Sequence, residues 1–148
     1  MDIWIITDSA ADCTPKEISE LNIDILDMPV IFDGETEPCL NIDIFWTSLL
    51  SNKTAFTSQP SPEVIRGYFD LAKSTQSTVI CILISSHFSG TYETAVGIKE
   101  EVGYENIYII DSLNAYQNKK TCLTVYSKGI KSKEKDKIFP CFFILVLL

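Results

Sequence analysis

Short polar loops rich in hydroxyl groups recur in this sequence where an apolar run ends or a helix is expected to begin. Five of them carry Ser, Thr or Asp side chains: Asp8-Ser9, Thr57-Ser58-Gln59, Ser85-Ser86, Ser89-Gly90-Thr91 and Asp111-Ser112. In open α/β sheets, ligands bind at the carboxyl ends of the strands, beside the unpaired amides of helix amino termini. Hydroxyl and amide groups can hold a small anion there without a buried opposing charge. The loops therefore predict a site for a small anionic head group.

Ser89-Gly90-Thr91 is the loop best suited to binding an oxyanion. Glycine lets a ligand approach the backbone, and the flanking hydroxyls lie beside the amides of an expected helix start. An ordinary helix cap explains the same residues without a ligand, because Ser and Thr occupy cap positions routinely. Local sequence alone favours the capping alternative here, as it does for Thr57 and Ser61.

A serine hydrolase is the alternative from a different class. His87, the sole histidine, stands two residues before Ser89 and could act as its base. Asp8 or Asp111 could then orient the imidazole. However, the nucleophile motif G-x-S-x-G is absent, and a lone histidine in a loop is more often solvated or hydrogen-bonded. We therefore expect no catalytic residues and no enzymatic activity.

Metal and nucleotide sites have no recognisable pattern in the chain. The spacing of the acidic residues fits no calcium loop, and there is no Walker lysine motif, G-x-G-x-x-G or H-E-x-x-H. The five cysteines are scattered and never spaced as C-x-x-C, which argues against zinc and against a disulfide framework. The opening residues also lack the pattern of a signal peptide. We expect no metal, no cofactor, and reduced thiols in a cytoplasmic protein.

Charge is unevenly distributed along the 148 residues. The formal net charge is −8 and the isoelectric point lies near 4.5, so the surface repels phosphate groups and nucleic acid is not an expected partner. Residues 1–118 carry 18 acidic side chains against five basic ones, whereas residues 119–148 carry seven basic side chains against two acidic ones. This reversal predicts a boundary near residue 115. The closing apolar run is too short to cross a bilayer, so no transmembrane segment is expected.

Strand and helix signals alternate over residues 1–115. Apolar, β-branched runs predict strands at Ile3–Thr7, Ile23–Phe32, Thr78–Ile84 and Asn106–Ile110, with Pro29 marking an edge or a bend. Capping residues and periodic apolar positions predict helices from Thr14 to Leu21, from about Asn41 to Leu50, from Ser61 onward and from Thr91 to Gly103. This alternation predicts an α/β fold with a mostly parallel sheet and helices on both faces. The tail over 116–148 is expected to be irregular or disordered.

Five of these segments together resemble the landmarks of the DegV family. In chain order they are Ile6-Thr7-Asp8-Ser9-Ala10-Ala11-Asp12, Phe32-Asp33-Gly34-Glu35, Thr57-Ser58-Gln59-Pro60-Ser61-Pro62, Ser89-Gly90-Thr91-Tyr92 and Ile110-Asp111-Ser112. The resemblance covers residues 1 to about 115. It implies the amino-terminal α/β lipid-binding domain of a protein with two domains, between which a long-chain fatty acid lies in a tunnel.

The resemblance also implies a carrier, which in bacteria presents the fatty acid to a fatty-acid kinase. Thr57 and Ser89 are the residues expected to hydrogen-bond the carboxylate, helped by the backbone near Gly90. Other residues are expected to line the same rim: Asp8, Ser9, Ser58, Ser85 and Thr91.

Two departures from the family pattern bear on whether the chain includes the second domain of the family. Cys39-Leu40 stands where the family usually shows Asp-Gly, and Asn114-Ala115-Tyr116-Gln117 replaces a glycine-bearing stretch. With the charge reversal, they lead us to expect a truncated gene product in which the second domain is absent and 116–148 is a divergent basic and apolar tail. Losing one wall of the tunnel would impair fatty-acid binding. A non-functional gene fragment is therefore a further alternative.

Overall fold

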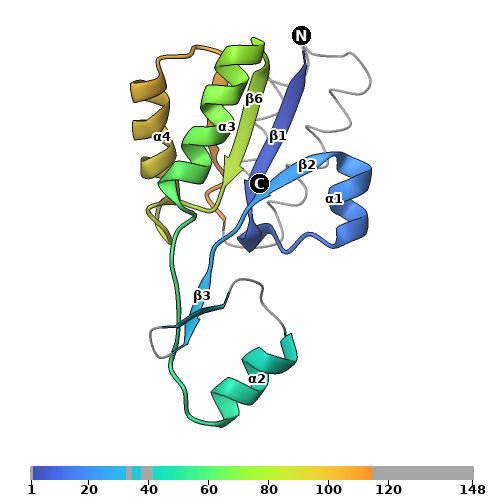
Figure 1. Cartoon of the computed structure of the whole chain (residues 1–148), viewed down its shortest axis with the longest axis vertical. Coiled ribbons are helices and arrows are strands. Elements are labelled where there is room, and N and C mark those ends of the chain that lie inside the picture. Colours follow the sequence, from blue (N-terminus) through green and yellow to red (C-terminus); the bar gives the residue numbers. More distant parts are fainter. Residues whose placement is uncertain (1, 33–34, 38–41, 115–148) are drawn as a thin grey trace.

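The computed structural model describes residues 2–32, 35–37 and 42–114 (Figure 1). Its main sheet has four parallel strands in the order β2-β1-β6-β7. Their bounds are Ile3–Asp8 for β1, Ile23–Leu26 for β2, Thr78–Leu83 for β6 and Ile107–Asp111 for β7. The predictions for Asp33-Gly34, Cys39-Leu40, Asn41 and the tail over 116–148 lie outside the described residues.

The two central strands, β1 and β6, are rich in buried apolar residues. Every residue of β6 is buried, which explains its uninterrupted β-branched sequence, because a strand covered on both faces needs no polar alternation. Side chains of β1 alternate between the faces, so that Ile6 joins one core and Ile5 the other. The Thr7 hydroxyl donates to the carbonyl of Ile82 at 2.7 Å, which satisfies a polar group that burial would otherwise leave unpaired.

Helices pack on both faces of this sheet. Phe69 of α3 (Pro62–Thr75) and Ile98 of α4 (Thr91–Val102) share one core with Ile6 and Val79. On the other face, Ile18 and Leu21 of α1 (Pro15–Leu21) pack against a second core that contains Ile5 and Ile23. The predicted α/β class, mostly parallel sheet and helices on both faces are therefore confirmed. None of the described helices is both long enough and apolar enough to cross a membrane.

A smaller unit follows β2, and we call it the three-strand module. It consists of β3 (Val30–Phe32), β4 (Glu35–Glu37), α2 (Ile42–Leu50) and β5 (Ala55–Thr57), with the antiparallel strand order β4-β3-β5. Figure 1 shows it at one end of the molecule, joined to the main α/β body by two chain segments. The single extended segment predicted over Ile23–Phe32 is thus two strands in different sheets, separated at the predicted bend around Pro29.

The helix boundaries confirm most of the predicted caps. Thr14 and Glu17 form a reciprocal capping box at the start of α1, and Gly103 ends α4 with a φ of 61°. Ser61 is a correction: it precedes α3 but makes no side-chain cap. Its hydroxyl instead donates to the carboxylate of Glu63, and this hydrogen bond lowers the pKa of Glu63.

Phe69 provides a test of the main core, because its side chain is 1% exposed between α3 and the sheet. Phe69→Ala should lower the free energy of unfolding by about 3–5 kcal/mol through lost burial and a cavity. Leu71→Ala is the matched control on the same helix, since Leu71 is 52% exposed, and its effect should stay within about 0.5 kcal/mol. Urea unfolding followed by circular dichroism measures both. Equal effects of the two changes, or no cooperative transition, would contradict this core.

Candidate functional site

The carboxyl ends of β1, β6 and β7 meet at one edge of the sheet because these strands are parallel. Asp8 ends β1, Ser85 follows β6, and Asp111 ends β7. The structure therefore brings three of the five predicted polar loops to the same edge. We call this edge, with the start of α4 and the end of β5, the polar rim.

Asp8 lies at the polar rim, but its side chain is directed into the protein and not toward solvent. Its side chain is fully buried, and its carboxylate accepts hydrogen bonds from the amide of Ile84 at 2.6 Å and from the amide of Ala10 at 3.1 Å. A carboxylate bonded to backbone amides fixes the loops that carry those amides. Asp8 thus holds the loops after β1 and β6 in register, a role that its position in the sequence did not reveal.

Asp111 and Ser85 hold the next loop in a similar way. The Asp111 carboxylate accepts from the Ser86 hydroxyl at 2.6 Å and from the Leu113 amide at 2.8 Å. Ser85 is fully buried, and its hydroxyl accepts from the amide of His87 at 3.2 Å. These bonds fold residues 84–89 into a compact turn ahead of α4. Ser85, like Asp8, is positioned to shape the rim.

Ser89, Gly90 and Thr91 form the beginning of α4. Gly90 is the N-cap residue and provides no side-chain cap, so the alternative of an ordinary Ser or Thr cap does not describe this helix. The hydroxyls of Ser89 and Thr91 are hydrogen-bonded at 2.8 Å, and the amide of Thr91 donates to the Ser89 hydroxyl at 3.3 Å. Thr91 is buried, whereas Ser89 is only half-buried. Because a hydroxyl has one donor and two acceptor sites, Ser89 can still meet a ligand.

Thr57 reaches the rim from the three-strand module. It is exposed at the end of β5, where it pairs with Val30, so this predicted loop residue is a strand residue. Gln59, two positions on, accepts a hydrogen bond from the hydroxyl of Thr94 on α4 at 3.1 Å. The segment that follows Thr57 is thereby attached to the first turns of the helix that Ser89 precedes. Sequence reasoning assigned no role to Gln59 or Thr94.

Ser9 and Ser58 lie where the module joins the main body. Ser9 is half-buried and its hydroxyl accepts from the amide of Met28 at 2.9 Å. Ser58 is also half-buried, with its amide bonded to the carbonyl of Pro29 at 3.2 Å. Both residues therefore stabilise the connection between the two units.

The described residues do not assemble a catalytic pair at Ser89. His87 is exposed, and within the described ranges no hydrogen bond joins its imidazole to Ser89, whose hydroxyl is bonded to Thr91. Among the same residues, no three His, Cys, Asp or Glu side chains gather as they would around a metal ion. The arrangement is one of neutral donors at a helix amino terminus, which suits recognition of an anion.

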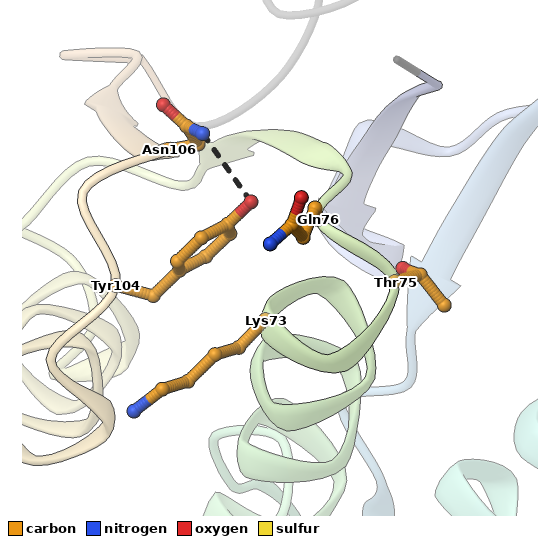
Figure 2. Close-up of a pocket in the computed structure, with 5 residues that line it drawn as sticks. All are labelled: Lys73, Thr75, Gln76, Tyr104 and Asn106. Atoms are coloured by element: carbon orange, nitrogen blue, oxygen red, sulfur yellow. Dashed lines mark hydrogen bonds between the residues drawn. The ribbon is translucent and has the colours of Figure 1, made fainter.

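A polar pocket of about 790 Å³ lies at the opposite edge of the sheet, where β6 and β7 begin (Figure 2). It is lined by Lys73, Thr75, Gln76, Tyr104 and Asn106. The hydroxyl of Tyr104 donates to the carbonyl of Ser77 at 3.0 Å, and the ammonium of Lys73 donates to the carbonyl of Val102 at 2.5 Å. These bonds satisfy backbone carbonyls at the end of α4 and just before β6. Neither of them involves the polar rim.

Residues 2–133 match a family model described as "Uncharacterised protein, DegV family". The chain belongs to the DegV family. A DegV domain-containing protein from Caldanaerobacter subterraneus subsp. tengcongensis is 35% identical over 115 residues, which are 74% of this chain and 40% of that relative. A second, from Clostridium perfringens, is 36% identical over 115 residues with the same coverage. This DegV chain thus spans about 40% of the length of these curated relatives. The family match runs past residue 115, and the predicted boundary there stays a prediction.

A solved structure of a DegV-family protein agrees with the fold. DegV from Bacillus subtilis, described as a fatty acid binding protein, superposes with a TM-score of 0.82 at 25% identity, over 98% of this chain and 54% of that one.

Asp8 allows a direct test of how the rim is held in this DegV chain. Asp8→Asn replaces one acceptor oxygen by an amide donor that faces a backbone amide. It should therefore lower the free energy of unfolding by about 1.5–3 kcal/mol. Asp70→Asn, at an exposed position of α3, is the control and should change it by less than about 0.5 kcal/mol. Unfolding by urea measures both, and an Asp8→Asn chain as stable as the wild type would refute this role.

Proposed function

We propose that this chain binds a long-chain fatty acid through its carboxylate, with the hydroxyls of Thr57 and Ser89 as donors. The observation that carries the proposal is the hydrogen bond at 3.1 Å between Gln59, two residues after Thr57, and Thr94 on the helix that follows Ser89. This contact links the segment that follows Thr57, in the module, to the helix that follows Ser89, in the main body. The description of the Bacillus subtilis relative as a fatty acid binding protein supports a fatty acid as the ligand.

The chemistry of the rim supports a carboxylate in particular. Its loops contain hydroxyls and backbone amides but no Lys or Arg, and the carboxylates of Asp8 and Asp111 are bonded to backbone amides. The hydroxyls of Ser89 and Thr91 share one hydrogen bond in which either can donate. When the Thr91 hydroxyl is the donor, the Ser89 proton is available to an oxyanion, and the amino terminus of α4 adds a favourable dipole. The backbone at Gly90, which is exposed, completes the proposed set.

An exposed aromatic side chain precedes one of the proposed donors. Phe88 is next to Ser89 in the chain and is 71% exposed. Phe56, which is 62% exposed, precedes Thr57 in β5, where successive side chains point to opposite faces. An acyl chain that leaves the carboxylate site would gain about 0.8 kcal/mol for each methylene that it buries against an apolar surface. We therefore propose that the Phe88 ring contacts the first part of the acyl chain.

A carrier role in the cytoplasm is the biological part of the proposal. It rests on the family resemblance, which implies presentation of the fatty acid to a fatty-acid kinase, and it requires no enzymatic step and no cofactor. Because the chain spans about 40% of its curated relatives, the activity of the whole protein belongs to this proposal too.

Removal of either donor should weaken binding of palmitate. Thr57→Val and Ser89→Ala should each raise the dissociation constant about tenfold or more, because hydrogen bonds to a charged group contribute roughly 1.5–3 kcal/mol. Ser74→Ala is the matched control, since its hydroxyl donates to the carbonyl of Leu71 far along α3. Isothermal titration calorimetry measures all four chains. Unchanged palmitate affinity in both rim variants would overturn the proposed site.

Methyl palmitate distinguishes the carrier from the hydrolase. The ester cannot offer a carboxylate, so it should bind more weakly than palmitate to the wild type, and this preference should shrink in Ser89→Ala. No methanol should be released on incubation. Turnover of the ester that disappears in Ser89→Ala would instead support a serine hydrolase that uses Ser89 and His87.

A further inference from the structure

The position of the three-strand module depends on a short connection, which we call the neck. It consists of residues 27–29 and 58–61, the two segments that join the module to the main body in Figure 1. The amide of Ser58 donates to the carbonyl of Pro29 at 3.2 Å, so the two segments are bonded to each other. The neck residues belong to neither sheet, and the hydrogen-bond ladders therefore do not fix the module against the body.

Side chains attach the neck to the main body at two points. Ser9 accepts from the amide of Met28 at 2.9 Å, on the side of β1. Gln59 accepts from the hydroxyl of Thr94 at 3.1 Å, on the side of α4. The second bond lies closer in sequence to both proposed donors, because Gln59 is two residues after Thr57 and Thr94 is five residues after Ser89.

Gly90 makes room for the Gln59 side chain. Its backbone, at φ −71° and ψ 5°, is one that any residue can adopt, so conformational freedom does not explain a glycine here. A Cβ atom at this position would stand 3.2 Å from Oε1 of Gln59, closer than an ordinary contact. The glycine therefore serves the close approach of the carboxamide to the helix start.

We infer that Gln59 is a positioning residue for the carboxylate site, with Thr94 as its anchor and Gly90 as the space it requires. This inference rests on the proposed function. The Gln59–Thr94 hydrogen bond sets the position of the Thr57 hydroxyl relative to Ser89, and so determines whether both can bind one carboxylate. Gln59 and Thr94 need not touch the ligand themselves.

Removal of either partner tests the inference. Gln59→Met and Thr94→Val should each raise the dissociation constant for palmitate about threefold to tenfold, the effect of one neutral hydrogen bond. The double variant should have a dissociation constant for palmitate no higher than that of the single variant with the larger loss, because the two changes remove the same bond. Thr94→Ser keeps the hydroxyl and should retain wild-type affinity. Thr47→Val is the control, since its hydroxyl donates to the carbonyl of Asp43 within α2.

Two further readouts separate positioning from a general loss of structure. Binding of methyl palmitate should be nearly unchanged in Gln59→Met, because the ester does not use the carboxylate site. Gly90→Ala should weaken palmitate binding in the wild-type background but not in a Gln59→Ala background, where the carboxamide is gone. Equal losses for acid and ester would overturn the inference.

The outcomes also separate the inference from the proposed function. If Thr57→Val and Ser89→Ala weaken palmitate binding while Gln59→Met and Thr94→Val do not, the carboxylate site stands and the positioning role is wrong. If the wild type does not bind palmitate, the proposed function fails, and the inference fails with it.

Discussion

The carboxylate of Asp8 is fully buried where β1 ends, and it accepts hydrogen bonds from the amides of Ala10 and Ile84. A buried charge is costly unless it is well bonded, so the loops after β1 and β6 are constrained to keep their amides around it. The loop after β6 leads directly to Ser89 and α4. The position of the polar rim therefore depends on the buried hydrogen bonds of the Asp8 carboxylate.

The second constraint is that the rim draws on two separate units. Ser89 precedes a helix of the main body, whereas Thr57 ends a short strand of the three-strand module. A rigid parallel sheet can position the first but not the second. The neck supplies the missing connection, through bonds to Ser9 and Thr94. A carboxylate bound by both hydroxyls would in turn join the two units, so ligand binding and the placement of the module are expected to be coupled.

Local signals made most of the fold predictable from the sequence. The buried strand β6, the capping box at Thr14 and the stop at Gly103 all follow from neighbouring residues. Helix α2 and the extended conformation of β3 were predicted, but their assembly into a second sheet was not. Strands β3, β4 and β5 have three residues each, too few to show a period, and β5 pairs with a distant strand. Parallel strands end at one edge, so the rim was predictable. The Gln59–Thr94 bond joins neutral residues 35 positions apart, which no sequence pattern marks.

Mapping of palmitate binding by amide chemical shifts in the ¹⁵N-labelled chain tests the central claim most directly. If the carboxylate is held at the polar rim, the largest shifts on titration should fall on the amides of residues 57–59 and 89–92. The signals of Lys73 and Tyr104, in the pocket at the opposite edge of the sheet, should barely move. Shifts centred on that pocket, or none that saturate with palmitate, would contradict the account.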